Sequence, residues 1–402
     1  MITVVGIGAD GWDGISTASR LAISAAEVLV GSPRQLDLIP PTPAERLPLP
    51  SPLLPALPEL LTAHEDQEVC VLASGDPMFF GIGATLARLL GPGALRVLPH
   101  VSSLSLACAR LGWPVERVTP ISLLGRPLAA VTATLQPGAR VLVLSPDGGT
   151  PAEVAALLTG RGYGASTLTV LSDLGTPAET RVSGTAATWA HPATAPLNVI
   201  AVECAPAGGT RPLPRTPGLP DDAFDHDGQI TKREVRAVTL SRLAPMPGEL
   251  LWDVGAGAGS VAIEWMRTHP TCAAIAVESH PARATRIRRN AEILGVPTLR
   301  LIESHAPEAL AGLPAPDAVF VGGGTTTPGV LETSWHALRP GGRLVVNAVT
   351  LESEAVVTRW HAAHGGDLTR LSVHRASPIG GFTGWRAMMP VTIWATTKED
   401  MS

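Results

Sequence analysis

Short runs of β-branched and aliphatic residues alternate along the whole chain with longer stretches rich in alanine and leucine. The runs of the first half extend from ITVVGIG to LNVIAVE, and those of the second half extend from ELLWDVG to GRLVVNAV. Such runs are typical of buried strands, and the stretches between them are long enough for helices. Strands that alternate with helices form mostly parallel sheets covered by helices. The pattern therefore predicts an α/β fold for both halves, with MPVTIWAT as an added final strand.

The alternation is interrupted at residues 204–224, where proline, glycine and charged residues replace the apolar runs. Proline-rich stretches favour extended spacers, so this segment is predicted to be a linker. We expect a first domain at residues 1–207, a linker at 208–222 and a second domain at 223–402. An earlier proline cluster, at residues 39–61, is followed closely by an apolar run, which favours a surface excursion within the first domain.

Composition argues against several classes of function. The formal net charge of −5 and a pI near 6.1 provide no basic field for a nucleic-acid partner. No apolar run approaches the roughly 18 residues of a membrane span, and no basic segment precedes the first apolar run, so we expect a cytoplasmic protein without a membrane partner. The four cysteines are widely spaced, and neither a disulfide framework nor a metal site is predicted.

The stretch DVGAGAGSVAIEW, residues 253–265, places three glycines between an apolar run and a helical pattern. Glycines at such a turn let a ligand approach the backbone, and the amides that open the helix can meet a polar group. Ser260 stands where the dinucleotide fingerprint has its third glycine, which favours S-adenosylmethionine over NAD. A purely structural turn is the alternative.

Further candidates follow the other predicted strands of the second half. Glu278 ends the run CAAIAVE, where a carboxylate can accept hydrogen bonds from ribose hydroxyls in either type of cofactor site. A solvent-facing glutamate is the alternative. The backbone of Ala306 can meet an adenine edge, Gly323 lies in a glycine run that leaves space for a bulky substrate, and Asn347 lies near the end of the fifth strand.

Five stretches of the second half, in order, carry a specific resemblance: HDGQITKREVRAVTLSRL, DVGAGAGSVAIE, FVGGG, VVNAVTLES and SPIGGFTGWRAMMPVTIW. Over about residues 225–395 the chain resembles the decarboxylating precorrin methyltransferases of cobalamin biosynthesis. The resemblance implies a Rossmann-like class I methyltransferase fold, with S-adenosylmethionine contacted by Thr231, Gly255, Ala256, Gly257, Ala258, Gly259, Glu278 and Ala306. His305 departs from the family pattern and is expected at the rim. Arg375 and Arg386 flank SPIGGFTGW and are candidates to grip substrate carboxylates, or else solvated surface charges.

The first half resembles another family. VVGIGADG, LASGDPMFFGIGATLARLL and PHVSSLSLACARLG are similar to motifs of the tetrapyrrole methylases over about residues 1–205. That family has two α/β lobes that clasp S-adenosylmethionine between them. By this resemblance Gly8, the turn of Ser74, Gly75, Asp76 and Pro77, and the pair Ser102 and Ser103 border the cofactor. The two serines are equally compatible with a helix N-cap.

The two resemblances together imply one enzyme with two S-adenosylmethionine sites and an acidic tetrapyrrole substrate. The expected reaction methylates precorrin-6Y at C5 and C15 and decarboxylates its C12 acetate, giving precorrin-8. Methyl transfer depends mainly on positioning, and we assign no catalytic side chain. The chain is expected to form a homo-oligomer. Two alternatives are an NAD-dependent oxidoreductase and a non-catalytic tetrapyrrole-binding protein.

Overall fold

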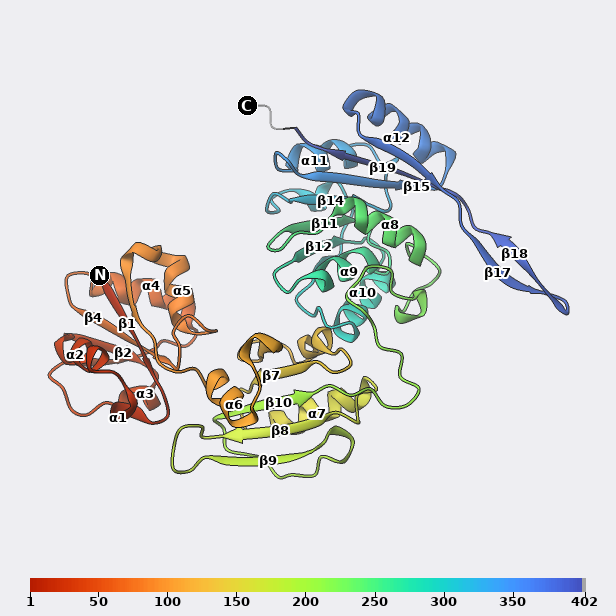
Figure 1. The fold of residues 1–402 in the computed structure, drawn as a ribbon. Helices are drawn as coiled ribbons and strands as arrows, with labels where there is room; N and C mark the ends of the chain where they lie inside the picture. The colour runs from red at the N-terminus through yellow and green to blue at the C-terminus, as the bar shows by residue number, and fades with distance from the viewer. Residues whose placement is uncertain (400–402) are drawn as a thin grey trace. The chain divides into compact units, whose positions relative to one another are not determined.

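The computed structural model describes residues 1–399, and within it the chain forms two compact units. Unit 1 comprises Met1–Leu128 and Pro137–Thr210, and unit 2 comprises Ala129–Gln136 and Arg211 to the C-terminus. The chain therefore passes from one unit to the other three times along its length. Each unit is an α/β structure (Figure 1).

The first sheet of unit 1 is fully parallel, with strand order β3-β2-β4-β1-β5. Its strands are β1 (Ile2–Ile7), β2 (Val28–Gly31), β3 (Glu45–Pro48), β4 (Val69–Ser74) and β5 (Leu95–Leu98). Its helices are α1 (Gly11–Gly14), α2 (Thr17–Ala25), α3 (Pro33–Asp37), α4 (Leu53–Ala63) and α5 (Ile82–Leu90). The early proline cluster, predicted as a surface excursion, instead supplies β3 and α4, because Leu57 and Leu61 bury the helix against the sheet.

The second sheet of unit 1 is mixed, with strand order β6-β7-β10-β8-β9. Its strands are β6 (Val118–Ser122), β7 (Arg140–Leu144), β8 (Thr167–Ser172), β9 (Thr180–Thr185) and β10 (Asn198–Glu203). Only β6 and β7 pair in parallel. Helix α6 (Ser103–Leu111) packs on this sheet through Leu104 and Cys108, and α7 (Thr150–Gly160) follows β7.

Unit 2 is built on a seven-stranded sheet of order β13-β12-β11-β14-β15-β19-β16. Its strands are β11 (Leu250–Val254), β12 (Ala273–Val277), β13 (Arg300–Ile302), β14 (Ala318–Val321), β15 (Arg343–Ala348), β16 (Asp367–Leu371) and β19 (Val391–Thr397). The first five strands are parallel, and β19 runs antiparallel to β15. The predicted final strand is therefore confirmed, since β19 covers most of MPVTIWAT.

Helices cover both faces of this sheet, and separate clusters of buried side chains lie on its two sides. They are α8 (Arg233–Leu243), α9 (Ser260–Thr268), α10 (Pro281–Ile293), α11 (Val330–Ala337) and α12 (Leu351–His364). Trp265 of α9 belongs to one cluster and Val330 of α11 to the other. Such a sheet presents the carboxyl ends of its parallel strands together at one edge, where ligands bind in this class of fold.

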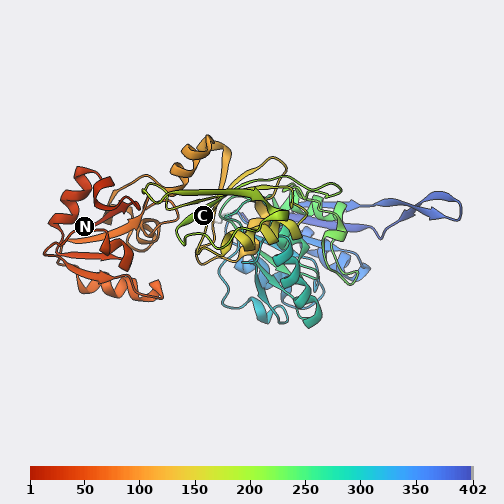
Figure 2. The same cartoon turned by 90° about the horizontal axis from the view of Figure 1, so that it is seen from below.

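One element leaves the body of unit 2. Strands β17 (His374–Ile379) and β18 (Phe382–Ala387) form a two-stranded ribbon that projects away from the seven-stranded sheet (Figures 1 and 2). Phe382 and Trp385 near its tip are 85% and 75% exposed. Sequence reasoning did not resolve this ribbon, because its two strands pair only with each other.

The segment predicted as a linker is partly built into unit 2. Leu219 is buried in the core, and its amide and that of Gly218 donate hydrogen bonds to the Glu264 carboxylate. The carbonyl of Leu213 accepts hydrogen bonds from Arg267 and from Gln136. Residues 211–222 therefore pack with the second domain instead of forming a free spacer, because apolar and backbone groups of the segment find partners there.

The short segment Ala129–Gln136 also belongs to unit 2, although it lies within the first half of the sequence. Its apolar side chains Val131 and Leu135 are buried. The backbone carbonyl of Ala133 accepts a hydrogen bond from Arg215, and a Cβ on Gly295 would lie 2.4 Å from the Ala133 amide nitrogen. The segment thus packs closely against residues that follow much later in the sequence.

Candidate functional site

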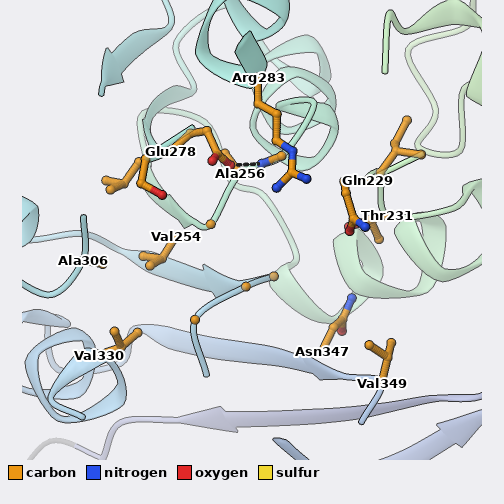
Figure 3. Close-up of a pocket in the computed structure, with 18 of the residues that line it drawn as sticks. Gln229, Thr231, Val254, Ala256, Glu278, Arg283, Ala306, Val330, Asn347 and Val349 are labelled. Carbon is orange, nitrogen blue, oxygen red and sulfur yellow. Dashed lines mark hydrogen bonds between the residues drawn. The ribbon is translucent and has the colours of Figure 1, made fainter. Parts of the chain in front are cut away.

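A cavity of about 590 Å³ opens at the carboxyl edge of the unit 2 sheet (Figure 3). Each of the five parallel strands contributes the segment that follows or ends it: 255–257 after β11, 278–279 after β12, 304–306 after β13, 322–324 after β14, and Asn347 in β15. The chain before α8 and the chain before β19 complete the wall. The volume lies in the range typical of small-molecule sites.

The glycine loop after β11 has the backbone conformation and the close contacts that only glycine permits. Gly255 has φ +70°, and a Cβ there would lie 2.7 Å from the Cα of Gly323. Gly257 has φ +60°, and its Cβ would lie 3.1 Å from the carbonyl oxygen of Gln229. The loop is therefore pressed against two other segments of the cavity wall, and its backbone faces the space between them.

Glu278 connects two of these segments. One carboxylate oxygen accepts a hydrogen bond of 2.8 Å from the amide of Gly257, and the other accepts one of 2.9 Å from the amide of His280. Figure 3 shows the first bond, with Glu278 on one side of the cavity and Gln229 and Thr231 on the other. An ionised carboxylate has about four acceptor positions, so the two oxygens retain capacity for ribose hydroxyls.

Asp253 lies beneath the glycine loop and is fully buried. One of its oxygens accepts the amide of Ala262 at 3.0 Å, which caps the first turn of α9, because the N-cap residue Gly259 has no side chain. Its other oxygen has no partner among the described residues. Burial raises the pKa of Asp253 to about 7, and the neighbouring Glu278 charge adds to this increase.

A buried ionic network holds the chain that enters α8. Arg236 is fully buried and donates from Nε to Glu264 at 2.6 Å. It also donates to the backbone carbonyls of Thr231 and Leu219. The network fixes the backbone of Thr231 at the cavity wall and links it to Leu219, in the segment that precedes α8.

Most of the predicted cofactor residues of the second half line this cavity: Thr231, Gly255, Ala256, Gly257, Glu278 and Ala306. Ala258 and Gly259 do not. Ala258 is buried and its carbonyl accepts a hydrogen bond from Asn290, while the Cβ position of Gly259 faces Ile287. These two residues turn inward because α9 starts at this point and packs on α10.

Of the four residues predicted to contact the substrate, two line the cavity and two do not. Gly323 and Asn347 line the cavity, and the Asn347 amide donates to the Thr239 hydroxyl at 3.0 Å. Arg375 and Arg386 lie on the projecting ribbon and do not line it. Arg375 is paired with Asp221 at 3.0 Å and with Glu234 at 2.6 Å, so the structure does not present it to a ligand in the cavity. His305 lines the cavity.

Sequence reasoning missed several lining residues: Gln229, Lys232, Arg283, Thr327, Met388 and Met389. Met388 and Met389 reach the cavity only because the chain returns from the ribbon into β19. Lys232 had a visible signal, since it is one of only two lysines in the chain and lies directly beside Thr231.

The residues that are present fit an adenosyl cofactor. The glycine loop offers backbone at close range, Glu278 offers acceptors at the end of the second strand, and valines such as Val254 and Val330 give apolar surface for a base. No group of three or more potential metal ligands occurs in residues 1–399. Within the same residues, no helix has the length and apolarity needed to cross a membrane.

In unit 1 the structure brings the motif residues together at the carboxyl edge of the parallel sheet. The amide of Gly75 donates to the Ile7 carbonyl at 2.9 Å, and a Cβ on Gly75 would lie 3.1 Å from the Cα of Ser102. Gly8 packs near Asp10 and His100, whose side chains lie 3.3 Å apart.

The other motif side chains of unit 1 have local partners. Asp76 accepts the Met78 amide, which shapes the turn that also contains Pro77. Ser102 caps α6 by accepting the Ser105 amide, and Ser103 is the first residue of that helix. The N-cap interpretation of Ser102 is therefore confirmed, and its contact with a cofactor stays a prediction.

Each half of the chain matches a known protein family. Residues 222–398 match the precorrin methyltransferase domain family, and residues 1–190 match the tetrapyrrole (corrin/porphyrin) methylases. The predicted fold class is thereby confirmed for both halves, with a tetrapyrrole methylase fold followed by a Rossmann-like methyltransferase fold.

Three curated relatives illustrate the match. A precorrin-6Y C(5,15)-methyltransferase (decarboxylating) from Sinorhizobium sp is 50% identical over 99% of this chain and 96% of its own length. A protein of the same name from Mycobacterium tuberculosis (strain CDC 1551 / Oshkosh) is 47% identical over 99% of this chain and 100% of its own length. A probable cobalt-precorrin-6B C(15)-methyltransferase (decarboxylating) from Pyrobaculum calidifontis is 35% identical over 44% of this chain and 94% of its own length. Full-length identity at this level shows that the chain belongs to the family of decarboxylating precorrin-6Y C(5,15)-methyltransferases.

Proposed function

We propose that this chain methylates precorrin-6Y at C5 and C15 and decarboxylates its C12 acetate to give precorrin-8. The observation that carries the proposal is the 50% identity to a relative of that name, which extends over almost the whole of both chains. The cavity at the carboxyl edge of unit 2 supports it, because its glycine loop and Glu278 suit an adenosyl cofactor.

The residues of the cavity act by binding and orientation. When bound, S-adenosylmethionine would supply an electrophilic methyl group for a ring carbon of the substrate. The glycine loop and Glu278 would hold the cofactor, and the glycine run 322–324, which also lines the cavity, would leave space for the substrate because it has no side chains. Apolar side chains such as Val254 and Val330 would pack against the base of the cofactor and so fix its orientation. Positioning of this kind accounts for a large part of the rate of such a displacement.

The test is to incubate the purified chain with precorrin-6Y and S-adenosylmethionine and to weigh the product. We expect two methyl groups gained and one carbon dioxide lost. A product that gains no methyl group would overturn the proposal. Hydride transfer detected by nicotinamide absorbance would favour the oxidoreductase alternative, and tight binding of tetrapyrrole without turnover would favour the carrier.

We also propose two S-adenosylmethionine sites, one in each unit. In unit 1 the proposal rests on Gly8, Gly75 and Ser102, which gather at one sheet edge. Equilibrium dialysis with S-adenosylhomocysteine should give two equivalents bound per chain. Saturation at one equivalent would contradict this count.

We propose further that unit 1 methylates C5 and that unit 2 methylates C15 and removes the carboxyl group. The relative from Pyrobaculum calidifontis, which aligns with less than half of this chain, carries only the C(15) and decarboxylating terms in its name. The domain division is kept as a proposal, with the cut moved to between Thr210 and Arg211 so that residues 211–222 stay with unit 2; the short unit 2 segment Ala129–Gln136 then remains in the N-terminal piece, and the two pieces are tested both apart and mixed. The C-terminal piece should add one methyl group and release carbon dioxide. Release of carbon dioxide by the N-terminal piece alone would reverse the assignment.

Finally, we propose that the chain is a homo-oligomer whose copies cover the projecting ribbon. An isolated two-stranded ribbon is marginally stable in water, and this one exposes Ile379, Phe382 and Trp385. Light scattering after gel filtration should give a mass above that of one chain. The double variant Phe382→Ser and Trp385→Ser should shift it towards the monomer. A monomeric wild-type chain would overturn the proposal.

A further inference from the structure

Three charged side chains line the unit 2 cavity: Lys232, Glu278 and Arg283. Glu278 and Arg283 already have partners. The Glu278 carboxylate accepts two backbone amides. Arg283 donates to Asp227 at 3.0 Å, and this hydrogen bond lowers the pKa of Asp227 to about 2, so the pair stays ionised at neutral pH. Lys232 is different. The hydrogen bond formed by its Nζ is to the Gly228 carbonyl at 3.4 Å, and within residues 1–399 it forms no salt bridge.

Lys232 occupies a position where lysine is an unfavourable choice. It is the N-cap residue of α8, and its side chain makes no capping hydrogen bond. Ser, Thr, Asp or Asn at this position would satisfy a free amide of the first turn. A positive charge beside the positive end of the helix dipole is also unfavourable. Residues that break such local preferences concentrate at functional sites.

The chain contains only two lysines, and they differ in their contacts. Its only other lysine, Lys398, donates to the carbonyls of Trp335, His336 and Leu338, and so has a structural role at the end of α11. Lys232 has no such role. Its backbone is nevertheless held firmly, because the buried Arg236 binds the carbonyl of the preceding residue, Thr231. An ammonium group without a charged partner, on a fixed backbone in the wall of a cavity, is suited to hold an anion.

We propose that Lys232 anchors a carboxylate of the tetrapyrrole substrate in the unit 2 cavity, an inference that rests on the proposed function. The substrate is a macrocycle with several flexible carboxylate arms, and a compact ammonium with three rotatable donors suits such an arm. The arginines predicted for this task do not line the cavity, and Arg375 already has two carboxylate partners.

The chemistry also indicates which carboxylate is held. When the acetate loses carbon dioxide, the electrons of the broken C–C bond enter the conjugated ring, and the remaining methylene takes up a proton. A cation bound to that acetate would stabilise its charge before the reaction and would oppose the loss of carbon dioxide. Lys232 therefore binds a carboxylate that the product retains, and it acts as a positioning residue.

The test compares three variants of the full-length chain: Lys232→Met, Lys232→Arg and the control Arg233→Met. Arg233 is the next cation along the chain, is exposed, and does not line the cavity. The steady-state rate of carbon dioxide release is measured against the concentration of precorrin-6Y. Dialysis with S-adenosylhomocysteine and urea unfolding report cofactor binding and folding separately.

We expect Lys232→Met to raise KM for precorrin-6Y about ten- to hundredfold, with kcat changed by less than about threefold, because a charge-assisted bond is lost. Lys232→Arg should restore most of the affinity, and Arg233→Met should match the wild type. An unchanged KM, an equal loss of S-adenosylhomocysteine affinity, or a fall in kcat alone would each overturn the anchor role. Absence of product from the wild-type chain would instead refute the proposed function.

Discussion

Replacing Glu278 separates its two proposed tasks, which are holding the glycine loop and binding ribose. Its two oxygens accept the amides of Gly257 and His280 at 2.8 and 2.9 Å. Each hydrogen bond to a charged acceptor contributes about 1.5–3 kcal/mol. Glu278→Gln keeps one oxygen for an amide and loses the charge, whereas Glu278→Ala removes both acceptors.

We therefore expect the unit 2 site to bind S-adenosylhomocysteine about tenfold more weakly in Glu278→Gln and up to a hundredfold more weakly in Glu278→Ala, since each 1.4 kcal/mol is a factor of ten. The alanine variant should also lower the free energy of unfolding of unit 2 by about 1–3 kcal/mol. The unit 1 site should be unaffected.

The assay is equilibrium dialysis on the full-length chain over a range of ligand concentrations, with urea unfolding as the measure of stability. Glu303→Gln is the matched control, because Glu303 also follows a strand of the sheet but is exposed and pairs with Arg288 outside the cavity. If Glu278→Ala is less stable but binds S-adenosylhomocysteine as tightly as the wild type at both sites, the residue has a structural role only. If neither property changes, the reasoning about this site is refuted.

Three further predictions concern groups in the cavity wall and directly behind it. The pKa of Asp253 is about 7 in the folded chain and about 3.9 in the unfolded chain, so unit 2 should lose stability as the pH rises from 4 to 7. In urea melts at several pH values, the Asp253→Asn variant should not show this loss. A variant with the same pH profile as the wild type would contradict the assignment. Glu264→Gln removes a charged partner of the buried Arg236 and should lower the free energy of unfolding of unit 2 by about 3 kcal/mol. Arg242→Gln, which breaks an exposed ion pair, should lower it by about 0–1 kcal/mol. Equal effects of the two variants would refute the role of burial. Gly255→Ala should weaken cofactor binding in unit 2 and lower the stability of that unit, because the added Cβ would lie 2.7 Å from the Gly323 backbone. Gly93→Ala is the control: its Cβ would meet open space, so the variant should match the wild type in the same dialysis and urea assays.

The sequence was most informative where local pattern and chemistry coincide. A buried apolar run followed by alternate glycines predicts a strand, a turn and a helix, and Gly255 and Gly257 lie at the cavity as expected. The same pattern could not show that Gly259 faces α10, because the direction of a loop residue depends on where the helix starts.

Contacts between distant parts of the chain were the least predictable. Met388 lines the cavity only after the ribbon has left the sheet and returned. Arg375 is neutralised by Asp221, a residue that composition assigned to a linker. Leu219 is buried in the same proline-rich stretch, since a single apolar residue among prolines and charges carries no periodic signal.

The segment Ala129–Gln136 has a consequence for synthesis of the chain on the ribosome. It leaves the ribosome with the first half, whereas its partners Arg215 and Gly295 come much later in the sequence. At about 5–20 residues per second, the roughly 270 residues that follow Gln136 take on the order of fifteen to fifty seconds to appear. During this interval the Ala133 carbonyl lacks its hydrogen-bond donor Arg215, and the backbone around Gly295 that packs against the segment has not yet been made. The segment therefore reaches its final packing only when the second unit folds, long after its own synthesis.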